Sequence, residues 1–325
     1  MRYWLPYSIT VFCTTAGVVL LLWFFNIIPQ FQVQASQEKI SSPLPSFLDM
    51  TKNNQVTTLT YWLPTSIPLD NGKVIDNISA KSALAYDIST EKFLYVKNIT
   101  ERMPMASLTK IMTAIIALEH PKSDDAYLVH GRDLVGEDSM GLEPGEKLSL
   151  EELLYGIFLH SGNDAAEVLA DNVGDGRKEF ITNMNEKVKS LGLKDTHFTN
   201  PTGLEGDGDQ YTTAYDLLVM TRYGLTNFPL FAKTSSAVDI SISQTSTHKA
   251  YYMDNETNLL TSYPGVDGVK TGYTPEAGYC LVTDLNYSGH HILAVILGSD
   301  NRRDEMKRIL DYSLTSLGVP PPHHQ

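Results

Sequence analysis

The sequence predicts an α+β domain, with helices in the middle of the chain and an antiparallel sheet built from both of its ends. Three observations carry this prediction. Residues 80–98 alternate apolar and polar positions as the two strands of a hairpin do. Apolar residues at helical spacing follow between residues 105 and 225, and strand patterns return between residues 238 and 299. Elements segregated in this way along a chain are typical of the α+β class.

The helical part is predicted from apolar spacing and from capping residues. The segment from Met105 to His120 is apolar almost all round, which predicts a helix buried in the middle of the domain. Ser149 and Glu152 form a capping-box pattern at the start of the next helix. Three more helices are expected at "NDAAEVLADNV", at "RKEFITNMNEKVKSLGL", which ends on Gly192 as at a C-cap, and at "TAYDLLVMTRYGL". Together they form an all-helical subregion.

The last third of the sequence is predicted to return to strands. The segments with strand patterns are "VDISIS", "KTGYT", "YCLVTDLNYSG" and "HHILAVILGS". A final helix from Arg302 to Gly318 precedes the tail "PPPHHQ". The sheet therefore combines the early hairpin with these late strands.

The composition is that of an ordinary globular protein with an acidic balance. Of its 325 residues, 42% are hydrophobic and 19% are charged, which provides enough apolar material for a sizeable core. The formal net charge of −13 argues against a nucleic-acid partner and against an anionic membrane surface. The two cysteines, Cys13 and Cys280, lie in the apolar N-terminal segment and in a predicted strand, so we expect no disulfide.

The N-terminal segment indicates that most of the chain lies outside the cytoplasm. After Arg2 no charged residue occurs before Glu38, and the mostly apolar run from Ser8 to Ile28 is long enough for the ~30 Å core of a bilayer. We expect an uncleaved membrane anchor; a signal peptide removed after Ala35 is the alternative. In both cases the early positive charge stays inside and the rest of the chain is exported.

Four parts follow from these patterns. Residues 1–35 form the anchor or signal segment, and residues 36–69, rich in Ser, Pro, Gln, Asn and Thr, form a flexible tether. Residues 70–318 form the α+β domain, and residues 319–325 form a short tail.

A serine and a lysine share one face of the predicted buried helix. Ser107 and Lys110 stand three residues apart, which is nearly one helical turn. An ammonium group without a partner is costly to bury, so we expect the lysine to have a use there. A serine hydroxyl becomes a nucleophile when a base lies within hydrogen-bond reach, and lysine can be that base when burial and a second cation lower its pKa. We therefore predict Ser107 as a nucleophile and Lys110 as its base.

Two further motifs supply other parts of an acyl-transfer site. In "HSGNDAA", the Asn163 amide would orient Lys110 or a substrate carbonyl, and Ser161 would relay a proton between the amine and the leaving group. In "GVKTGYT", Lys270 and Thr271 suit the recognition of a substrate carboxylate. Lys270 would also be the second cation that lowers the pKa of Lys110.

Backbone positions and an arginine complete the expected site. Gly272 would let an extended substrate lie against the strand without a side chain in the way. Backbone N–H groups at Ser107 and near Tyr273 would form an oxyanion hole. Arg302 is a further candidate for the substrate carboxylate, with a salt bridge at the helix start as its alternative role. This chemistry calls for no metal ion and no cofactor, so we predict none.

The three motifs, S-x-x-K, S-x-N and K-T-G in this chain order, resemble those of the serine-based penicillin-binding and β-lactamase-like superfamily. The segments "PMASLTKIMTA", "LLYGIFLHSGNDAAEVLA", "THFTNPTGL", "TTAYDL" and "GVKTGYT" resemble more specifically the D-alanyl-D-alanine carboxypeptidases, the low-molecular-weight penicillin-binding proteins. The resemblance covers roughly residues 70–318.

The resemblance implies a role for each motif. It implies that Ser107 is the acylated nucleophile, that Lys110 is its base, and that Lys270, Thr271 and Gly272 hold a terminal carboxylate on an edge strand. Ser161 and Asn163 would form the second active-site element. The implied substrate is the peptidoglycan stem peptide ending in D-Ala-D-Ala, and β-lactams, which mimic that terminus, would acylate the same serine.

Several functions share these motifs, and the sequence leaves them open. A D,D-endopeptidase that cuts peptidoglycan cross-links would have the same site. A β-lactamase needs a base-activated water, commonly on a glutamate in a loop, whereas Glu167 and Glu179 both lie in helix patterns. A non-catalytic binder of cell-wall peptides would be expected to have lost one of the site residues. Many family members carry a further β-rich domain and a membrane helix; this sequence stops at Gln325, and the N-terminal anchor would replace that attachment.

Overall fold

The computed structural model describes residues 62–64, 75–136, 138–257 and 259–324. The predicted anchor or signal segment and nearly all of the predicted tether lie outside these residues, so both stay predictions. Within the described part of the chain, no helix is both long enough and apolar enough to cross a bilayer.

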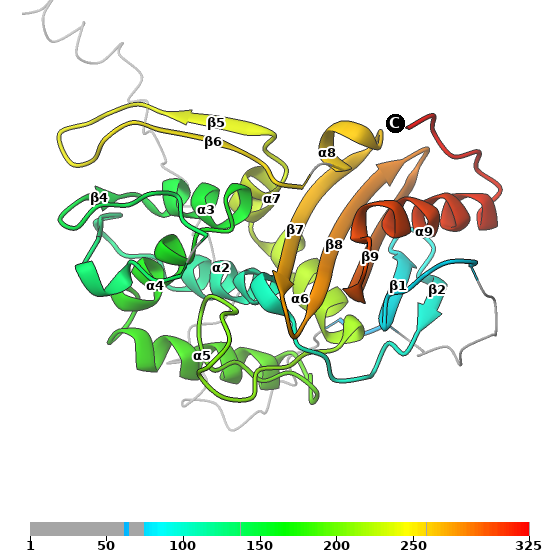
Figure 1. Cartoon of the computed structure of the whole chain (residues 1–325), viewed down its shortest axis with the longest axis horizontal. Coiled ribbons are helices and arrows are strands. Elements are labelled where there is room, and N and C mark those ends of the chain that lie inside the picture. Colours follow the sequence, from blue (N-terminus) through cyan, green and yellow to red (C-terminus); the bar gives the residue numbers. More distant parts are fainter. Residues whose placement is uncertain (1–61, 65–74, 137, 258, 325) are drawn as a thin grey trace, which may run out of the picture. The chain divides into compact units, whose positions relative to one another are not determined.

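A five-stranded antiparallel sheet forms one layer of the domain (Figure 1). Its strands, in the order β2-β1-β9-β8-β7, are β1 (Ser82–Asp87), β2 (Lys92–Lys97), β7 (Val266–Thr274), β8 (Gly278–Tyr287) and β9 (His290–Ser299). β1 pairs with β9, so the early hairpin and the late strands share one sheet, as predicted. β7, which carries the K-T-G motif, is an edge strand.

Both faces of the sheet are covered. Along β9, Leu293, Val295 and Leu297 pack into a core with the helical region, and the alternate residues Ile292 and Ile296 pack into a second core. Helix α9 (Arg302–Ser316) covers that second side (Figure 1), and its apolar residues belong to the second core. Successive side chains of a strand point to opposite faces, which explains why the sequence of β9 reads as an almost continuous apolar run.

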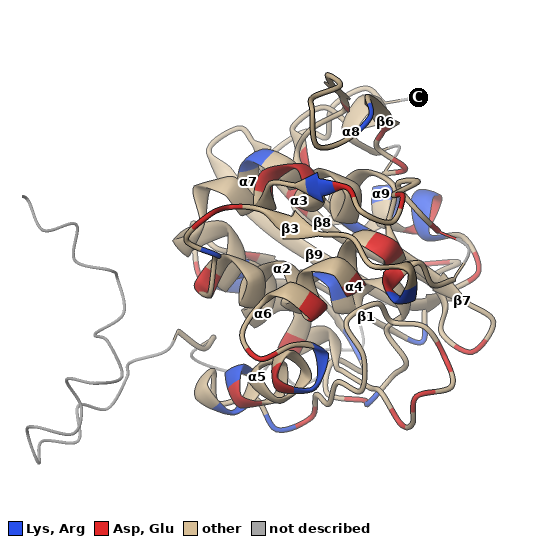
Figure 2. Ribbon diagram, turned by 90° about the vertical axis from the view of Figure 1, so that its left-hand side faces the viewer, with Lys and Arg blue, Asp and Glu red and all other residues tan. Residues whose placement is uncertain are grey.

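The helical region surrounds one buried helix, α2 (Lys110–Glu119), as the sequence predicted. Packed against α2 are α3 (Leu150–Leu159), α4 (Asn163–Asn172), α5 (Arg177–Ser190), α6 (Ala214–Asn227) and α7 (Pro229–Ser235). The sequence did not predict α7, and α6 is longer than expected. Basic and acidic residues share the surface of α5 (Figure 2).

Capping residues define two helix ends where the sequence placed them. Ser149 accepts a hydrogen bond from the Glu152 backbone, and the Glu152 carboxylate accepts one from the Ser149 N–H at 2.7 Å. This reciprocal pair satisfies backbone donors at the start of α3. Gly192 has a φ of +74° just beyond α5, which is the conformation that favours glycine at a helix C-terminus.

The remaining elements are short. They are β3 (Tyr127–Leu128) with β4 (Lys147–Leu148), β5 (Asp239–Ile242) with β6 (Tyr251–Asp254), the 3-10 turn η2 (Gly131–Asp133) and α8 (Leu259–Ser262). The sequence predicted β5 but not its partner β6. Cys280 lies buried in β8 as a free thiol.

Candidate active site

The predicted nucleophile lies on a tight turn and not inside the helix proper. The sequence predicted one helix from Met105, whereas residues Ala106–Thr109 form a 3-10 turn, η1, before α2 begins at Lys110. Ala106 has a φ of +48° at the start of this turn. Ser107 therefore precedes α2, with only 9% of its surface exposed.

Two glycines make room for the Ser107 turn. A Cβ on Gly203, whose φ is +90°, would lie 2.0 Å from the Ala106 carbonyl oxygen. A Cβ on Gly272 would lie 3.1 Å from the Ser107 nitrogen. We expected Gly272 to keep a side chain away from the substrate; the space it leaves is taken by the Ser107 turn. The turn is thus held between β7 and the residues around Gly203.

Lys110 lies at the centre of the predicted site and is fully buried. Its Nζ lies 3.1 Å from the Ser107 Oγ, 2.7 Å from the Asn163 Oδ1 and 2.8 Å from the Thr202 carbonyl oxygen. Asn163 is the first residue of α4, so three separate segments meet at one amine. These contacts bring Ser107, Lys110 and Asn163 together.

Three oxygen atoms surround the Lys110 amine. In the structure Nζ donates to the Asn163 Oδ1, to the Thr202 carbonyl oxygen and to the Ser107 Oγ, so three acceptors match the three N–H groups of an ammonium group. When the amine is uncharged, the Asn163 and Thr202 oxygens can hold its two N–H groups, because they only accept hydrogen bonds, and its lone pair is then free for the Ser107 hydrogen. The contact between Nζ and Oγ at 3.1 Å is therefore a path for proton transfer.

The electrostatic surroundings of Lys110 favour the same state. Burial lowers the pKa of Lys110 well below its ordinary value, and the positive charge of Lys270 lowers it further. Asp138, Asp164 and Glu167 act in the opposite direction. The lysine pKa therefore depends on a balance between burial, one neighbouring cation and three carboxylates.

Lys270 and Thr271 lie on β7 beside this cluster, and both are almost fully buried. The Lys270 Nζ donates to the Thr271 carbonyl oxygen at 2.9 Å. Burial lowers the pKa of Lys270 to about 8; Arg302 acts in the same direction, and Glu256 opposes it. Because β7 is an edge strand, an extended peptide can align with it beside Ser107.

Ser161 and Arg302 are the two remaining predicted site residues. Ser161 is buried just before α4, with a φ of +55°. The Lys110 hydrogen bonds found among the described residues do not include Ser161, so its relay role stays a prediction. The Arg302 Nη1 donates to the Gly272 carbonyl oxygen at 2.8 Å, and its guanidinium lies 5.3 Å from the Tyr279 ring centre. Arg302 thus supports β7 from the start of α9.

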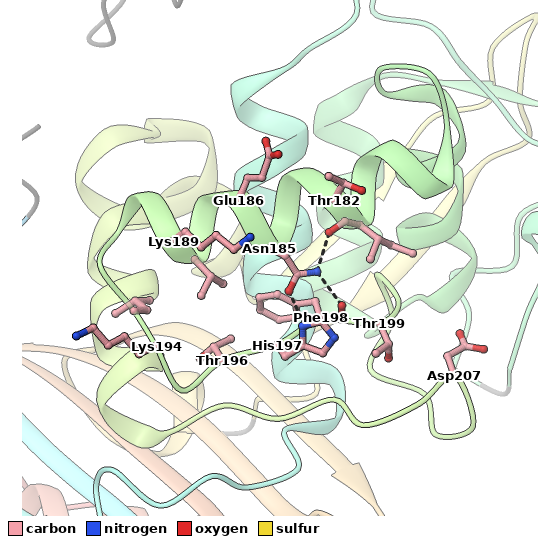
Figure 3. Close-up of a pocket in the computed structure, with 13 residues that line it drawn as sticks. Thr182, Asn185, Glu186, Lys189, Lys194, Thr196, His197, Phe198, Thr199 and Asp207 are labelled. Atoms are coloured by element: carbon pink, nitrogen blue, oxygen red, sulfur yellow. Dashed lines mark hydrogen bonds between the residues drawn. The ribbon is translucent and has the colours of Figure 1, made fainter. Parts of the chain in front are cut away.

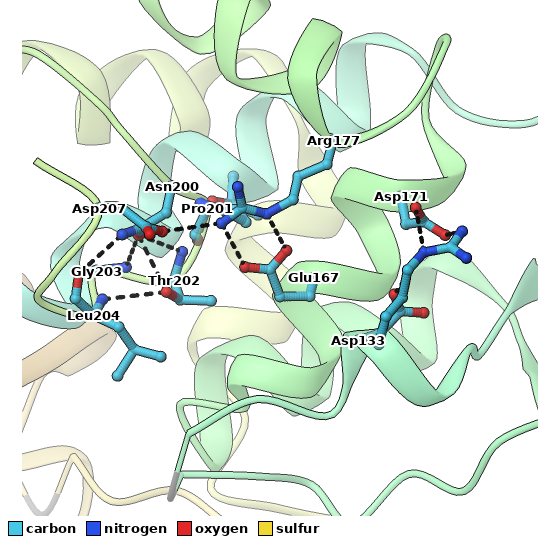
Figure 4. Close-up of polar contacts among 12 residues, drawn as sticks. Asp133, Glu167, Asp171, Arg177, Asn200, Pro201, Thr202, Gly203, Leu204 and Asp207 are labelled. Carbon is cyan, nitrogen blue, oxygen red and sulfur yellow. Dashed lines mark hydrogen bonds and ion pairs between the residues drawn. The ribbon is translucent and has the colours of Figure 1, made fainter.

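Residues 200–204, which we call the 200–204 turn (Figure 4), end the segment "THFTNPTGL" that carries the family resemblance, but the sequence assigned them no role. The Asn200 Oδ1 accepts from the backbone N–H groups of Thr202 and Gly203. This turn points the Thr202 carbonyl at Lys110 and sets Gly203 against Ala106. The signal was present in "NPTG", because Asn, Pro and Gly in this order mark a tight turn.

A cleft of about 350 Å³ opens beside the Ser107 turn. It is lined by Met105 and Ala106 on one side, by residues of the 200–204 turn and of the following loop on another, and by Thr274 at the end of β7. The cleft therefore adjoins both the start of the Ser107 turn and the end of β7 at Thr274.

A second cavity, of about 780 Å³, lies between α5 and residues 193–199 (Figure 3). None of the predicted site residues lines it. Within it the Asn185 side chain donates to the Phe198 carbonyl and accepts from the Phe198 N–H. Asn185 thus ties α5 to the strand-like segment that leads into the 200–204 turn.

Among the described residues, His130, Asp133 and Asp171 bring possible metal-ligand atoms within 4.8 Å of one another. The Arg132 guanidinium, however, donates to both oxygens of Asp171, at 3.2 and 2.5 Å (Figure 4). A cation therefore already occupies this carboxylate. The cluster has no hydrogen bond to the Ser107 and Lys110 pair, and we assign it no metal.

Comparison with solved structures identifies the class: the fold is that of the penicillin-binding proteins. The crystal structure of a Streptomyces DD-transpeptidase matches with a TM-score of 0.69 and 31% identity, over 75% of this chain and 100% of that chain. An evolved putative penicillin-binding protein homolog from Mycobacterium tuberculosis matches with a TM-score of 0.67 and 27% identity, over 81% and 99%.

The family is narrower than the class. The D-alanyl-D-alanine carboxypeptidase family matches residues 70–301, and this chain belongs to it, as the motifs predicted. D-alanyl-D-alanine carboxypeptidase DacF of Bacillus subtilis is 35% identical, over 79% of this chain and 68% of the relative. DacD of Escherichia coli is 32% identical, over 72% of this chain and 62% of the relative. The chain thus spans about two thirds of these curated relatives.

Proposed function

We propose that this chain is a serine-type D-alanyl-D-alanine carboxypeptidase that removes the terminal D-Ala from peptidoglycan stem peptides. The observation that carries the proposal is the set of hydrogen bonds at the buried Lys110, which holds its amine 3.1 Å from the Ser107 Oγ. Family membership supports the same reaction, because the relatives are described as D-alanyl-D-alanine carboxypeptidases.

The reaction begins with proton transfer from Ser107. The Lys110 amine takes the Oγ proton while Oγ attacks the carbonyl carbon of the penultimate D-Ala. The tetrahedral intermediate places its negative oxygen at the backbone N–H groups of Ser107 and Tyr273. The C–N bond then breaks, and the proton passes to the leaving amine through Ser161, so that D-Ala departs and an ester on Ser107 remains.

Water completes the cycle. Lys110, again neutral, takes a proton from a water molecule whose oxygen attacks the ester carbonyl, and the Ser107 oxygen leaves with a proton. The shortened peptide is released with a new carboxylate. A β-lactam would form the same ester, because ring opening by Ser107 follows the same path.

Substrate binding is assigned to the strand side of the site. Lys270 and Thr271 would bind the terminal carboxylate, and Arg302 would hold Gly272 and the rest of β7 in register through the Gly272 carbonyl. The peptide chain before the attacked bond would lie along β7 into the cleft beside Met105 and Thr274. An N-terminal anchor in residues 1–35, a tether in 36–69 and a catalytic domain in 70–318 would place this site outside the cytoplasm.

Two related activities differ from this one only in the leaving group or in the acceptor of the acyl group. A D,D-endopeptidase would release a cross-linked peptide amine instead of D-Ala. A transpeptidase would pass the acyl group to an amine instead of water, and the solved Streptomyces relative is described as a DD-transpeptidase. A β-lactamase is disfavoured because Glu167 lies inside α4 and is held by Arg177, at 2.7 and 3.1 Å.

Intact-protein mass spectrometry tests the proposal. The full chain in detergent is incubated with benzylpenicillin, with Ser107→Ala as the control. A stable adduct on the wild type alone, together with release of D-Ala from a D-Ala-D-Ala peptide, is the expected result. Faster cleavage of a cross-linked dimer would reassign the chain as an endopeptidase. Rapid loss of penicillin without an adduct would indicate a β-lactamase, and neither adduct nor turnover would leave a non-catalytic binder.

A further inference from the structure

Three charged residues link α4, the helix that begins at Asn163, to the surface. The Arg177 guanidinium, at the start of α5, donates to the Glu167 carboxylate at 2.7 and 3.1 Å and to the Asp207 carboxylate at 3.1 Å (Figure 4). Glu167 is buried, with 8% of its side chain exposed, whereas Arg177 and Asp207 are 43% and 53% exposed. The buried end of this link lies close to the site, and the other end lies in solvent.

Glu167 is placed to act on Lys110. It follows Asn163 by four residues on α4, so both side chains lie on the same face of the helix. Asn163 bonds directly to the Lys110 amine. A negative charge at Glu167 therefore favours the ammonium form of Lys110, and that form is not a base.

Arg177 opposes this effect. Its two parallel hydrogen bonds to Glu167 form a bidentate pair, which puts one positive charge directly on the buried carboxylate. Arg177 itself stays charged, because its bonds to Glu167 raise its pKa above the ordinary value. Arg177 therefore offsets part of the negative charge that Glu167 presents to Lys110.

We propose that Arg177 is a positioning residue for catalysis: it neutralises Glu167 from outside the site and thereby keeps Lys110 available as the uncharged base. This inference rests on the proposed function, since it assigns Arg177 a part in setting the pH range of that reaction. The other charged groups that act on Lys110 are Lys270 on β7, Asp164 on α4 and Asp138 in the preceding loop. Asp164 is held by the backbone N–H groups of residues 140, 141 and 142 and has no such arginine.

The experiment measures the rate of acylation by benzylpenicillin between pH 5 and pH 10, for the full chain and four variants. The acidic limb of this profile reports the deprotonation of Lys110. Arg177→Gln leaves Glu167 unpaired and therefore raises the pKa of Lys110. The acidic limb should move to higher pH by about one unit. At a pH below the limb, the acylation rate should then be about tenfold lower than in the wild type. Glu167→Gln leaves Arg177 unpaired and moves the limb to lower pH.

The double variant and two controls separate charge from structure. Glu167→Gln with Arg177→Gln removes both charges, so its limb does not show the alkaline shift of Arg177→Gln. Arg177→Lys keeps the positive charge and stays near the wild type. Asp207→Asn weakens the contact between Arg177 and the loop that carries residue 207 but leaves Arg177 paired with Glu167. The acidic limb of this variant should therefore not move. Thermal unfolding of each variant shows that it is folded under the assay conditions.

The outcomes are distinct. If the wild type is not acylated at any pH, the proposed function itself fails. If the wild type is acylated but Arg177→Gln leaves the limb in place, Arg177 does not tune Lys110 and only this inference is overturned. It is also overturned if the double variant keeps the alkaline shift, or if Asp207→Asn produces an equal shift, since a purely structural role of Arg177 would give those results.

Discussion

The two sides of the site each bury a lysine, but they hold it differently. On the helical side, Lys110 has two carbonyl acceptors and a hydroxyl around its amine, and its pKa lies well below the ordinary value. On the strand side, Lys270 bonds to a neighbouring backbone carbonyl, and its pKa falls only to about 8. The difference teaches that burial alone does not decide a lysine's role. The hydrogen-bond partners differ, and the roles we propose, a base at Lys110 and a cation at Lys270, follow that difference.

Replacing each lysine by methionine should give the largest difference between the two sides of the site. Lys110→Met removes the base and should lower kcat by about 10² to 10⁴, with little change in KM. Lys270→Met removes a binding charge and should mainly raise KM for a peptide with a free carboxylate. Steady-state kinetics on a D-Ala-D-Ala peptide measure both. Equal losses of kcat in the two variants would show that the lysines are not functionally distinct.

The two glycines that enclose the Ser107 turn lie on the two sides of the site, and substitutions there compare how closely each side packs against the turn. Gly203→Ala sets a Cβ against the Ala106 carbonyl at a positive φ and should cost at least ~3 kcal/mol of stability, with loss of acylation. Gly272→Ala, without a positive φ and at 3.1 Å, should cost less. Gly206→Ala is the matched control, since its φ is +106° with no atom within 4 Å; it should cost about 1 kcal/mol. Chemical denaturation measures all three, and equal losses at Gly203 and Gly206 would contradict the steric reason.

The alkaline limb of the pH profile separates the two lysines further. Lys270 is charged below its pKa of about 8 and loses its charge above it, so kcat/KM for a free carboxylate should fall as the pH rises through 8. The expected fall is about tenfold per pH unit at most. A peptide whose C-terminus is amidated has no carboxylate to bind, so this limb should disappear with it. A limb of the same size on both peptides would assign the titration to another group.

A remote helix cap gives the smallest effect. Ser149→Ala removes the N-cap of α3 and should destabilise the domain by about 1 kcal/mol. Because Ser149 has no contact with either lysine, the acidic and alkaline limbs should both stay in place. Thermal unfolding and the pH profile of acylation check this together. A shifted limb would mean that lost stability, and not local charge, explains such shifts.

Much of the fold and the motifs were predictable because they depend on local patterns. The capping box at Ser149, the buried helix and the pairing of early and late strands all follow from spacing and composition. The motif residues Ser107, Lys110 and Asn163 do meet. Short elements such as α7 and β6 were missed, because their few residues carry little periodic signal.

What sequence reasoning missed at the site depends on contacts between distant segments. The Thr202 partner of Lys110 is a backbone carbonyl, which every residue type has, so no side chain marks it. The 3-10 turn at Ser107 packs against Gly272 of β7. The local sequence therefore marks neither the turn nor the need for a residue without a side chain at position 272. Arg177 and Glu167 lie on different helices, so only the folded structure brings their charges together.

The pairing of β1 with β9 has a consequence for the order of folding. Ser82 lies opposite Leu297, so the middle of the sheet joins two strands that are far apart in the sequence. Closing so long a loop is entropically costly and slow, and contacts of this kind delay folding. A fragment that ends before residue 290 contains every motif residue from Ser107 to Gly272 but lacks β9, which pairs with both β1 and β8. We therefore expect such a fragment to leave the K-T-G strand unconnected to the early hairpin and to show no acylation by benzylpenicillin.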